Sequence, residues 1–300
     1  MIWTKLRNAV AAVAALGAAA CTTVPQPRSA AAAGTGPALW KVSDADTTIY
    51  LFGTFHMLPE GTQWRTPALE QAIAASDELV IETLIGDQMA AARTMAQIGT
   101  SPGLPPILER VPADRRDDLE WVIKASGAPM AALDRLETWA AAMALSGATF
   151  RSLGLNPELG VEKGLEGTYK QRSRPVLGLE TVEEQLGYFD RLSEDAQRKF
   201  LMGVLDDPEE VRRQFAEMLR TWSTGDVEGI ARTFDADLKE SPELRDALLL
   251  RRNRNWAEWI DERLDRPGTT LVAVGAGHLA GNESVQRMLE GRGIRVVRVQ

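Results

Sequence analysis

The chain has 300 residues, of which 44% are apolar and 25% charged, and its formal net charge is −8. This length allows one large domain or two modest ones with an ample core, and the composition excludes global disorder. The acidic balance gives no electrostatic basis for binding nucleic acid, so we expect no nucleic-acid partner.

The first 20 residues have the features of an export signal. Lys5 and Arg7 precede an Ala-rich apolar run at residues 9–20, which is short for a transmembrane helix. Small residues then precede Cys21, the only cysteine, as in the lipobox of bacterial lipoproteins. We predict a signal peptide at residues 1–20, a membrane anchor through lipidated Cys21, and a location in the cell envelope outside the cytoplasm. Ordinary cleavage after an Ala-x-Ala site is the alternative.

The rest of the chain divides into a tether and one folded domain. Residues 21–37 are rich in Ala, Pro, Thr, Ser and Gly and predict a flexible tether, and residues 38–300 form the domain. Strand patterns occupy residues 39–42, 48–52, 78–81, 174–179, 270–274 and 294–299. Helical patterns occupy residues 66–76, 87–173 with breaks at 102–106 and 156–157, 181–264 and 283–290. Strands at both ends with helices between predict an α/β fold, namely a central mixed, largely parallel sheet with flanking helices and a long helical insertion.

The only two histidines, His56 and His278, occur in matched contexts. Each follows an apolar strand and stands three residues after a glycine, Gly53 or Gly275. Loops at the carboxyl ends of strands form the ligand crevice of such sheets, and glycine there allows the backbone to approach a ligand or cofactor closely. We predict that the two histidines share one polar site; two separate buried core histidines are the alternative.

Two glutamates follow strands in the same way. Glu82 directly follows the strand Leu79–Ile81, and Glu180 directly follows the strand predicted at residues 174–179. Each glutamate is followed by threonine. Two imidazoles and a carboxylate are sufficient ligands for a catalytic metal with open positions. We therefore predict that the two histidines and one of these carboxylates hold a divalent transition metal (Mn, Co or Zn), with Glu82 and Glu180 as the candidate catalytic carboxylates. A place at a helix N-terminus is the alternative for Glu180.

Several other classes of site lack their motifs. The chain has no His-Glu-x-x-His zinc helix and no glycine-rich phosphate loop with lysine. A cysteine nucleophile is excluded because Cys21 lies at the export signal. A Ser-His-Asp triad stays open, although no Gly-x-Ser-x-Gly elbow supports it.

Four ordered motifs resemble the TraB/GumN family, which includes the animal Wnt-cleaving TIKI proteases. These motifs are Gly53 to His56, Leu79 to Glu82, Gly178 to Gln185, and Gly275 to His278. The resemblance spans about residues 38–300, and Arg252-Asn253 is a weaker shared feature. Gly160-Val161-Glu162 is a variant of the family's Gly-Leu-acidic or Gly-Ile-acidic segment.

This resemblance implies an α/β fold with a shared crevice. For the TIKI branch it also implies a metal-dependent peptidase that uses His56, His278 and Glu82. The leading hypothesis is therefore an envelope metallopeptidase acting on a peptide or protein substrate, with Glu180 as general base. The alternatives are a lipoprotein that binds haem, metal or peptide without turnover, and a degenerate member that only binds a partner through the crevice.

Overall fold

The computed structural model describes residues 36–238 and 241–300. The predicted signal peptide, Cys21 and most of the predicted tether lie outside these residues. The described chain forms a six-stranded sheet in the order β4-β3-β5-β2-β1-β6. Its strands are β1 Leu39–Ser43, β2 Thr47–Thr54, β3 Glu78–Thr83, β4 Val176–Glu180, β5 Gly268–Gly275 and β6 Val296–Arg298.

The sheet is mixed and largely parallel, as predicted. β4, β3, β5 and β2 run parallel to one another, whereas β1 pairs antiparallel with β2 and β6. The strands predicted at residues 39–42 and 48–52 form a hairpin, β1 with β2. β6 is shorter than predicted because the N–H of Ile294 donates to the Leu289 carbonyl and so belongs to the end of the preceding helix.

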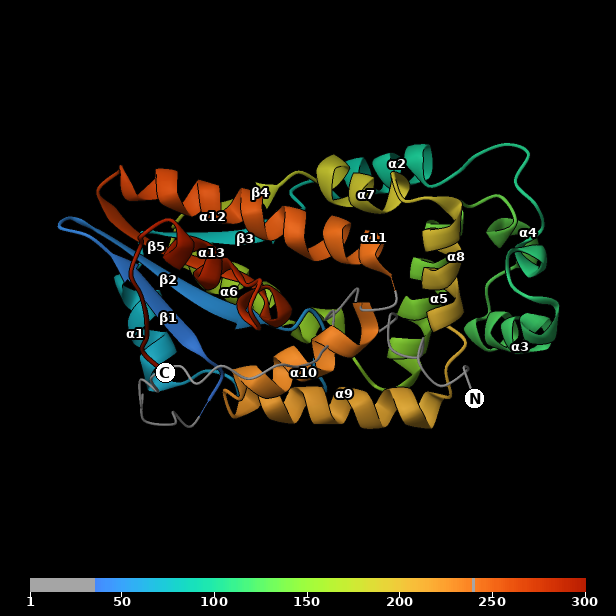
Figure 1. The fold of residues 1–300 in the computed structure, drawn as a ribbon, viewed down its shortest axis with the longest axis horizontal. Helices are drawn as coiled ribbons and strands as arrows, with labels where there is room; N and C mark the ends of the chain where they lie inside the picture. Colours follow the sequence, from blue (N-terminus) through green and yellow to red (C-terminus); the bar gives the residue numbers. More distant parts are fainter. Residues whose placement is uncertain (1–35, 239–240) are drawn as a thin grey trace.

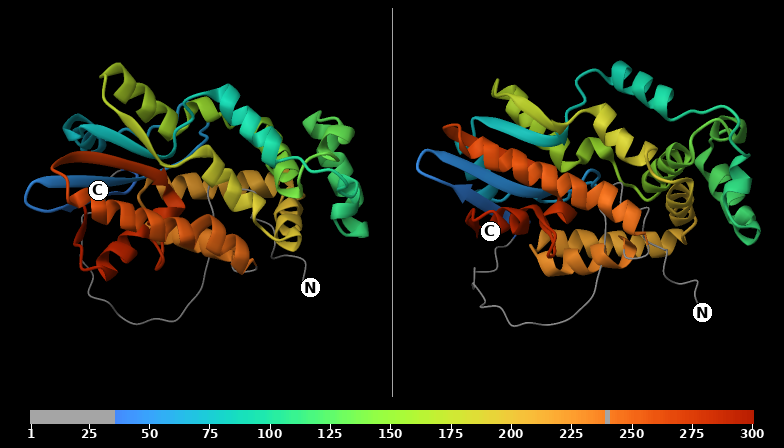
Figure 2. Two further views of the ribbon diagram at one scale, coloured as in Figure 1. Left: turned by 90° about the horizontal axis from the view of Figure 1, so that it is seen from above. Right: turned by 45° about the horizontal axis from the view of Figure 1, so that its top comes forward.

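Helices cover both faces of the sheet because its strands alternate apolar side chains between the two faces (Figures 1 and 2). On one face, Ile49, Val80 and Val272 pack with α12 (Arg251–Leu264) and α13 (Val285–Gly291). The opposite face packs with α1 (Pro67–Ala75) and α6 (Val161–Gln171). Thr66 caps α1 and Pro67 begins it, which agrees with the helical pattern predicted at residues 66–76.

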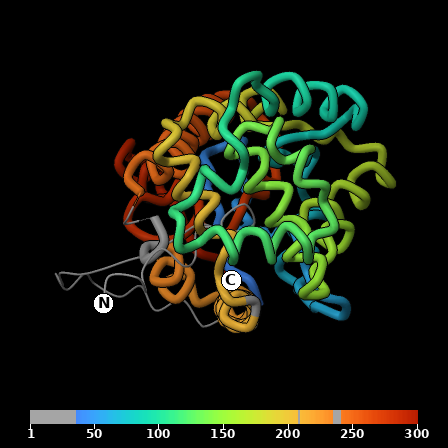
Figure 3. Tube along the Cα trace, turned by 90° about the vertical axis from the view of Figure 1, so that its right-hand side faces the viewer, coloured from blue at the N-terminus to red at the C-terminus, as the bar shows by residue number. Residues whose placement is uncertain are grey.

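The predicted helical insertion lies to one side of the sheet and beyond the carboxyl ends of its parallel strands (Figures 1 and 3). Its α-helices are α2 Gln88–Ile98, α3 Arg116–Ser126, α4 Met130–Leu133, α5 Thr138–Ser152, α7 Val182–Asp190, α8 Glu194–Gly203, α9 Pro208–Ser223, α10 Val227–Leu238 and α11 Pro242–Arg245. Short 3-10 turns occur at Ile107–Arg110, Ala113–Arg115 and Pro157–Leu159, where prolines interrupt the helical pattern. Among the described helices, none has the length and apolarity needed to cross a bilayer.

Candidate functional site

The predicted site residues meet at one edge of the sheet because the parallel strands all end there. His56 lies two residues beyond β2, and His278 lies in a 3-10 turn, η6 (Ala276–Leu279), directly after β5. β2 and β5 are neighbours in register, with Thr54 opposite Gly275. Glu82 lies near the end of β3, the other neighbour of β5.

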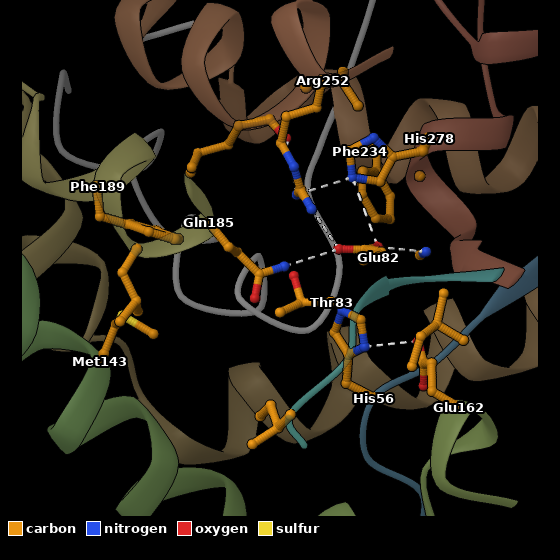
Figure 4. A pocket seen from close by; sticks show the side chains of 17 residues that line it. His56, Glu82, Thr83, Met143, Glu162, Gln185, Phe189, Phe234, Arg252 and His278 are labelled. Atoms are coloured by element: carbon orange, nitrogen blue, oxygen red, sulfur yellow. Dashed lines mark hydrogen bonds and ion pairs between the residues drawn. The ribbon is translucent and has the colours of Figure 1, made fainter. Parts of the chain in front are cut away.

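A cavity of about 270 Å³ opens at this edge (Figure 4). His56, His278, Glu82 and Gly275 line it. Its other lining residues are Ile81, Thr83, Ile85, Met143, Glu162, Gln185, Leu186, Phe189, Phe234, Leu248, Leu249, Arg252 and Gly277. The structure thus brings both histidines and one of the two predicted glutamates to one cavity.

Arg252 is the buried charge around which the site is built. Its Nε and one terminal nitrogen each lie 2.8 Å from an oxygen of Glu180, which makes a bidentate pair. The same terminal nitrogen donates to Glu82 Oε2 at 2.5 Å. Its guanidinium also lies 4.6 Å from the ring centre of Trp256, whose Nε1 donates to Glu180.

The helical period of α12 explains why an arginine occupies this buried position. Arg252, Trp256 and Ile260 are spaced four residues apart, so they share the stripe that faces the sheet. The first turn of this stripe is polar because it lies at the ends of the strands, where the carboxylates of Glu82 and Glu180 bind the Arg252 guanidinium. A π-helical turn, Asp246–Leu250, leads into α12 and directly precedes this turn.

Both carboxylate oxygens of Glu82 accept hydrogen bonds from neighbouring groups. Glu82 points toward α12 because it stands two residues after Val80, which faces the same way. Oε1 accepts the N–H of Gly275 at 2.7 Å, and Oε2 accepts from Arg252 and, at 3.4 Å, from Gln185. Burial opposes its ionisation, but Arg252 and the two histidines hold the pKa of Glu82 well below its usual range.

Gly275 permits this contact because a side chain would intrude into the site. A Cβ on Gly275 would lie 3.0 Å from Glu82 Oε1, 3.6 Å from His278 Cδ2 and 3.9 Å from His56 Nε2. The position therefore marks a point that all three predicted ligands surround. Gly53 does not line the cavity. It packs against Ala276 instead, and a Cβ on Gly53 would lie only 3.1 Å from Ala276 Cα.

His278 is held in one tautomer. Asn253 Nδ2 donates to the Glu283 carbonyl at 2.8 Å, which turns Asn253 Oδ1 toward His278 Nδ1 at 2.5 Å. Because an amide oxygen only accepts, Nδ1 carries the proton and Nε2 keeps its lone pair. Nε2 lies 3.3 Å from Arg252 and 4.0 Å from Glu82 Oε1. Burial and the Arg252 cation lower the pKa of His278 to about 3.

His56 has the opposite electrostatic environment. Its Nδ1 lies 2.7 Å from Glu162 Oε1, and Thr54 also donates to this carboxylate. Burial disfavours the imidazolium, but the Glu162 carboxylate outweighs it and raises the pKa of His56 to about 9. Gly160 allows α6 to bring Glu162 this close, since a Cβ there would lie 2.2 Å from the His56 carbonyl oxygen.

Glu180 lies at the same edge but does not line the cavity. Both of its oxygens bind Arg252, and one also accepts from Trp256. Thr181, not Glu180, caps α7, in a capping box with Glu184. In this structure Glu180 acts as a partner of Arg252, and its predicted role as general base stays a prediction.

The donor chemistry of the cavity suits a divalent transition metal. Both Nδ1 atoms bind acceptors, the arrangement that second-shell partners give to ligand histidines. His56 Nε2 is on the side of Gly275, and His278 Nε2 is on the side of Glu82, where it also lies 3.3 Å from Arg252. Within residues 36–238 and 241–300, however, no group of three or more His, Cys, Asp or Glu is already close enough together to hold an ion. The metal therefore stays a prediction that rests on donor chemistry.

Fold and site together define an α/β protein whose parallel strands end in a cavity with two histidines and a buried carboxylate–arginine cluster. Residues 38–298 match the model of the TraB/PrgY/gumN family, so the chain belongs to this family. It is 25% identical over 259 residues to the uncharacterized protein YbaP of Escherichia coli, covering 85% of this chain and 92% of YbaP. An uncharacterized protein of Treponema pallidum is 24% identical over 191 residues, 59% of this chain and 56% of that protein. No solved structure gives a significant match.

Sequence reasoning left the roles of Arg252, Asn253 and Glu162 unassigned. The first two carry a signal in the sequence, because they share the helical stripe of Trp256 and Ile260 where apolar residues are expected. Polar residues on a buried stripe require partners. Glu162 gives a weaker signal, since an acidic residue in the first turn of a helix is favourable without any further contact.

The Arg252 cluster predicts an unequal cost for two Glu→Gln substitutions. Glu180→Gln removes a buried carboxylate and leaves Arg252 with an incomplete countercharge, so we expect a loss of about 3–5 kcal/mol in unfolding free energy. Glu258→Gln, at an exposed position on α12, should change it by about 0.5 kcal/mol or less. Urea denaturation of both variants measures the difference. A similar small effect in both would contradict the role assigned to Glu180.

The two histidines should titrate far apart. NMR of the two imidazole signals should show one pKa near 9 and another near 3, and Glu162→Gln should lower the first because the opposing carboxylate is gone. Since the His56 pKa is raised from 6.5, its proton stabilises the fold below pH 6.5, and this contribution disappears as pH rises through 9. The depressed pKa of His278 gives stability above pH 6.5 that is lost as pH falls toward 3. Two pKa values near 6.5 would contradict both environments.

Proposed function

We propose that this protein is a metal-dependent hydrolase of peptide bonds in the cell envelope. The observation that carries the proposal is the pair of histidines, each with Nδ1 bound to an acceptor, and with Nε2 on the side of Gly275 in His56 and of Glu82 in His278. In this proposal His56, His278 and Glu82 hold the ion. The resemblance to the TIKI proteases supports peptide hydrolysis as the reaction.

A bound divalent metal would polarise the scissile carbonyl and make water a stronger nucleophile. The protein's own groups supply the rest of the chemistry. Asn253 and Glu162 orient the two imidazoles through their Nδ1 atoms. Arg252 lines the cavity and offers its positive charge to an oxygen that becomes negative during hydrolysis. Glu162 lines the cavity whereas Glu180 does not, so Glu162 is a second candidate for the general base.

The first prediction from this proposal concerns metal affinity. Titration of the chelator-treated full chain with Zn²⁺, Mn²⁺ or Co²⁺ should give one site, and His56→Ala or His278→Ala should each remove most of the affinity. Glu162→Gln should weaken it by about 10- to 100-fold, as the loss of a second-shell partner does. Glu258→Gln is the matched control and should leave it unchanged.

The same titration should also detect the release of a proton when the metal binds. His56 has a pKa of about 9, so it must lose its proton to ligate an ion at pH 7.5. Calorimetry in buffers of different ionisation enthalpy should therefore show about one proton released per ion, and affinity should increase with pH up to about 9. Unchanged metal binding in both histidine variants would refute the ligand assignment.

Hydrolysis itself needs a separate measurement. Incubation of the metal-loaded full chain with a peptide mixture should yield new peptide termini by mass spectrometry, and a chelator should abolish them. Glu82→Gln should reduce metal content, because a neutral amide is a poorer ligand than a carboxylate. Bound metal without cleavage of any peptide would instead favour a binding protein, and a Soret band on haem addition would identify haem as its ligand.

The N-terminal sequence supports the envelope location in this proposal. The basic residues, the apolar run and the single cysteine support export and lipidation at Cys21. Labelled palmitate should be incorporated by the parent chain and not by Cys21→Ala. A mature N-terminus at another residue, with no label, would leave secretion without a lipid anchor.

A further inference from the structure

The cavity has a second, apolar end that the proposed chemistry does not use. Met143 of α5 and Phe189 of α7 lie across the cavity from His278 and Glu82 (Figure 4). Leu186, Leu249 and Ile85 also line the cavity, and Ile85 is 53% exposed. The exposure of Ile85 places this end of the cavity at the protein surface, where it is accessible to a ligand from solvent.

Two neutral polar groups lie between the apolar end and the histidines (Figure 4). Thr83 Oγ1 is shielded from solvent, yet it has no hydrogen-bond partner in the described part of the chain. Burying a hydroxyl without a partner is costly, so such a group inside a cavity lining points to a ligand. The Gln185 side chain donates weakly to Glu82 and, among the described residues, its Oε1 accepts no hydrogen bond.

We propose that this end of the cavity binds one apolar residue of a peptide. The side chain packs between Met143 and Phe189, and the Thr83 hydroxyl and the Gln185 carboxamide bind the backbone of the same peptide. A peptide group has one donor and one acceptor, which matches a hydroxyl and a carboxamide better than it matches a charged pair. The choice of a peptide rests on the proposed function, whereas the apolar end and the unpartnered hydroxyl do not.

Binding of short peptides without metal tests this inference separately from catalysis. The probes are acetylated, amidated pentapeptides Gly-Gly-X-Gly-Gly in which X is Leu, Phe, Ser or Asp, titrated into the full chain with EDTA. The Leu and Phe peptides should bind about tenfold or more tightly than the Ser and Asp peptides, because their side chains leave water. Equal affinities, or tighter binding of decanoate than of the Leu peptide, would overturn the inference.

Thr83→Val separates a ligand-binding hydroxyl from a merely structural one. Valine keeps the branched shape, so the Leu peptide should bind about three- to tenfold more weakly for loss of one hydrogen bond. The melting temperature should increase, since a buried unpartnered hydroxyl is removed. Thr48→Val, on β2 outside the cavity lining, is the matched control and should leave peptide affinity unchanged. A higher melting temperature with unchanged affinity would overturn the role of Thr83.

Met143→Ala tests the apolar end by specificity. The shorter side chain enlarges the pocket, so the affinity ratio of the Phe peptide to the Leu peptide should increase. A loss of folding would not produce such a change in ratio, and an unchanged ratio would overturn the assignment of Met143. If peptides bind as expected but none is cleaved with any metal, the proposed hydrolase fails and this binding site stands.

Discussion

The site depends on one buried cation, the Arg252 guanidinium, held between the carboxylates of Glu82 and Glu180. A guanidinium in the protein interior is stable only when countercharges and hydrogen bonds replace its water. Two neighbouring strands supply them, so the arginine joins α12 to β3 and β4 at the edge of the sheet. The next residue in the helix, Asn253, is thereby placed against the imidazole of His278. Loss of this cation would remove the link between α12 and the ends of β3 and β4. It would also remove the constraint that holds Asn253 against His278.

Charge balance explains why two histidines in one cavity behave differently. His278 lies beside Arg252, and a second positive charge there is unfavourable, so it stays neutral. His56 lies beside the Glu162 carboxylate, which favours the protonated imidazolium and raises its pKa to about 9. The imidazole of His278 is therefore neutral, whereas that of His56 loses its proton only as the pH rises or when a metal ion would displace it. This pairing accounts for the proton release expected on metal binding.

The helical insertion gives the cavity its other character. The sheet edge supplies charged groups, and α5 and α7 supply Met143 and Phe189 opposite them. Charged groups thus lie at one end of the cavity and apolar surface at the other, a division that suits a ligand with both polar and apolar parts. Thr83, at the last position of β3, stands at the junction of the two ends.

The sequence by itself determined the local order of the fold and the place of the histidines. Apolar runs marked the strands, Thr66-Pro67 marked the start of α1, and glycine before His56 and His278 marked two strand-end loops. These features are short-range, so a sequence pattern is sufficient to predict them. The tertiary structure alone decided which strands are neighbours, and hence that Glu180 binds Arg252 from 72 residues away while Glu162 holds His56. Strand order and helix packing decide which groups pair with buried charges, and the spacing of residues along the sequence does not predict either of them.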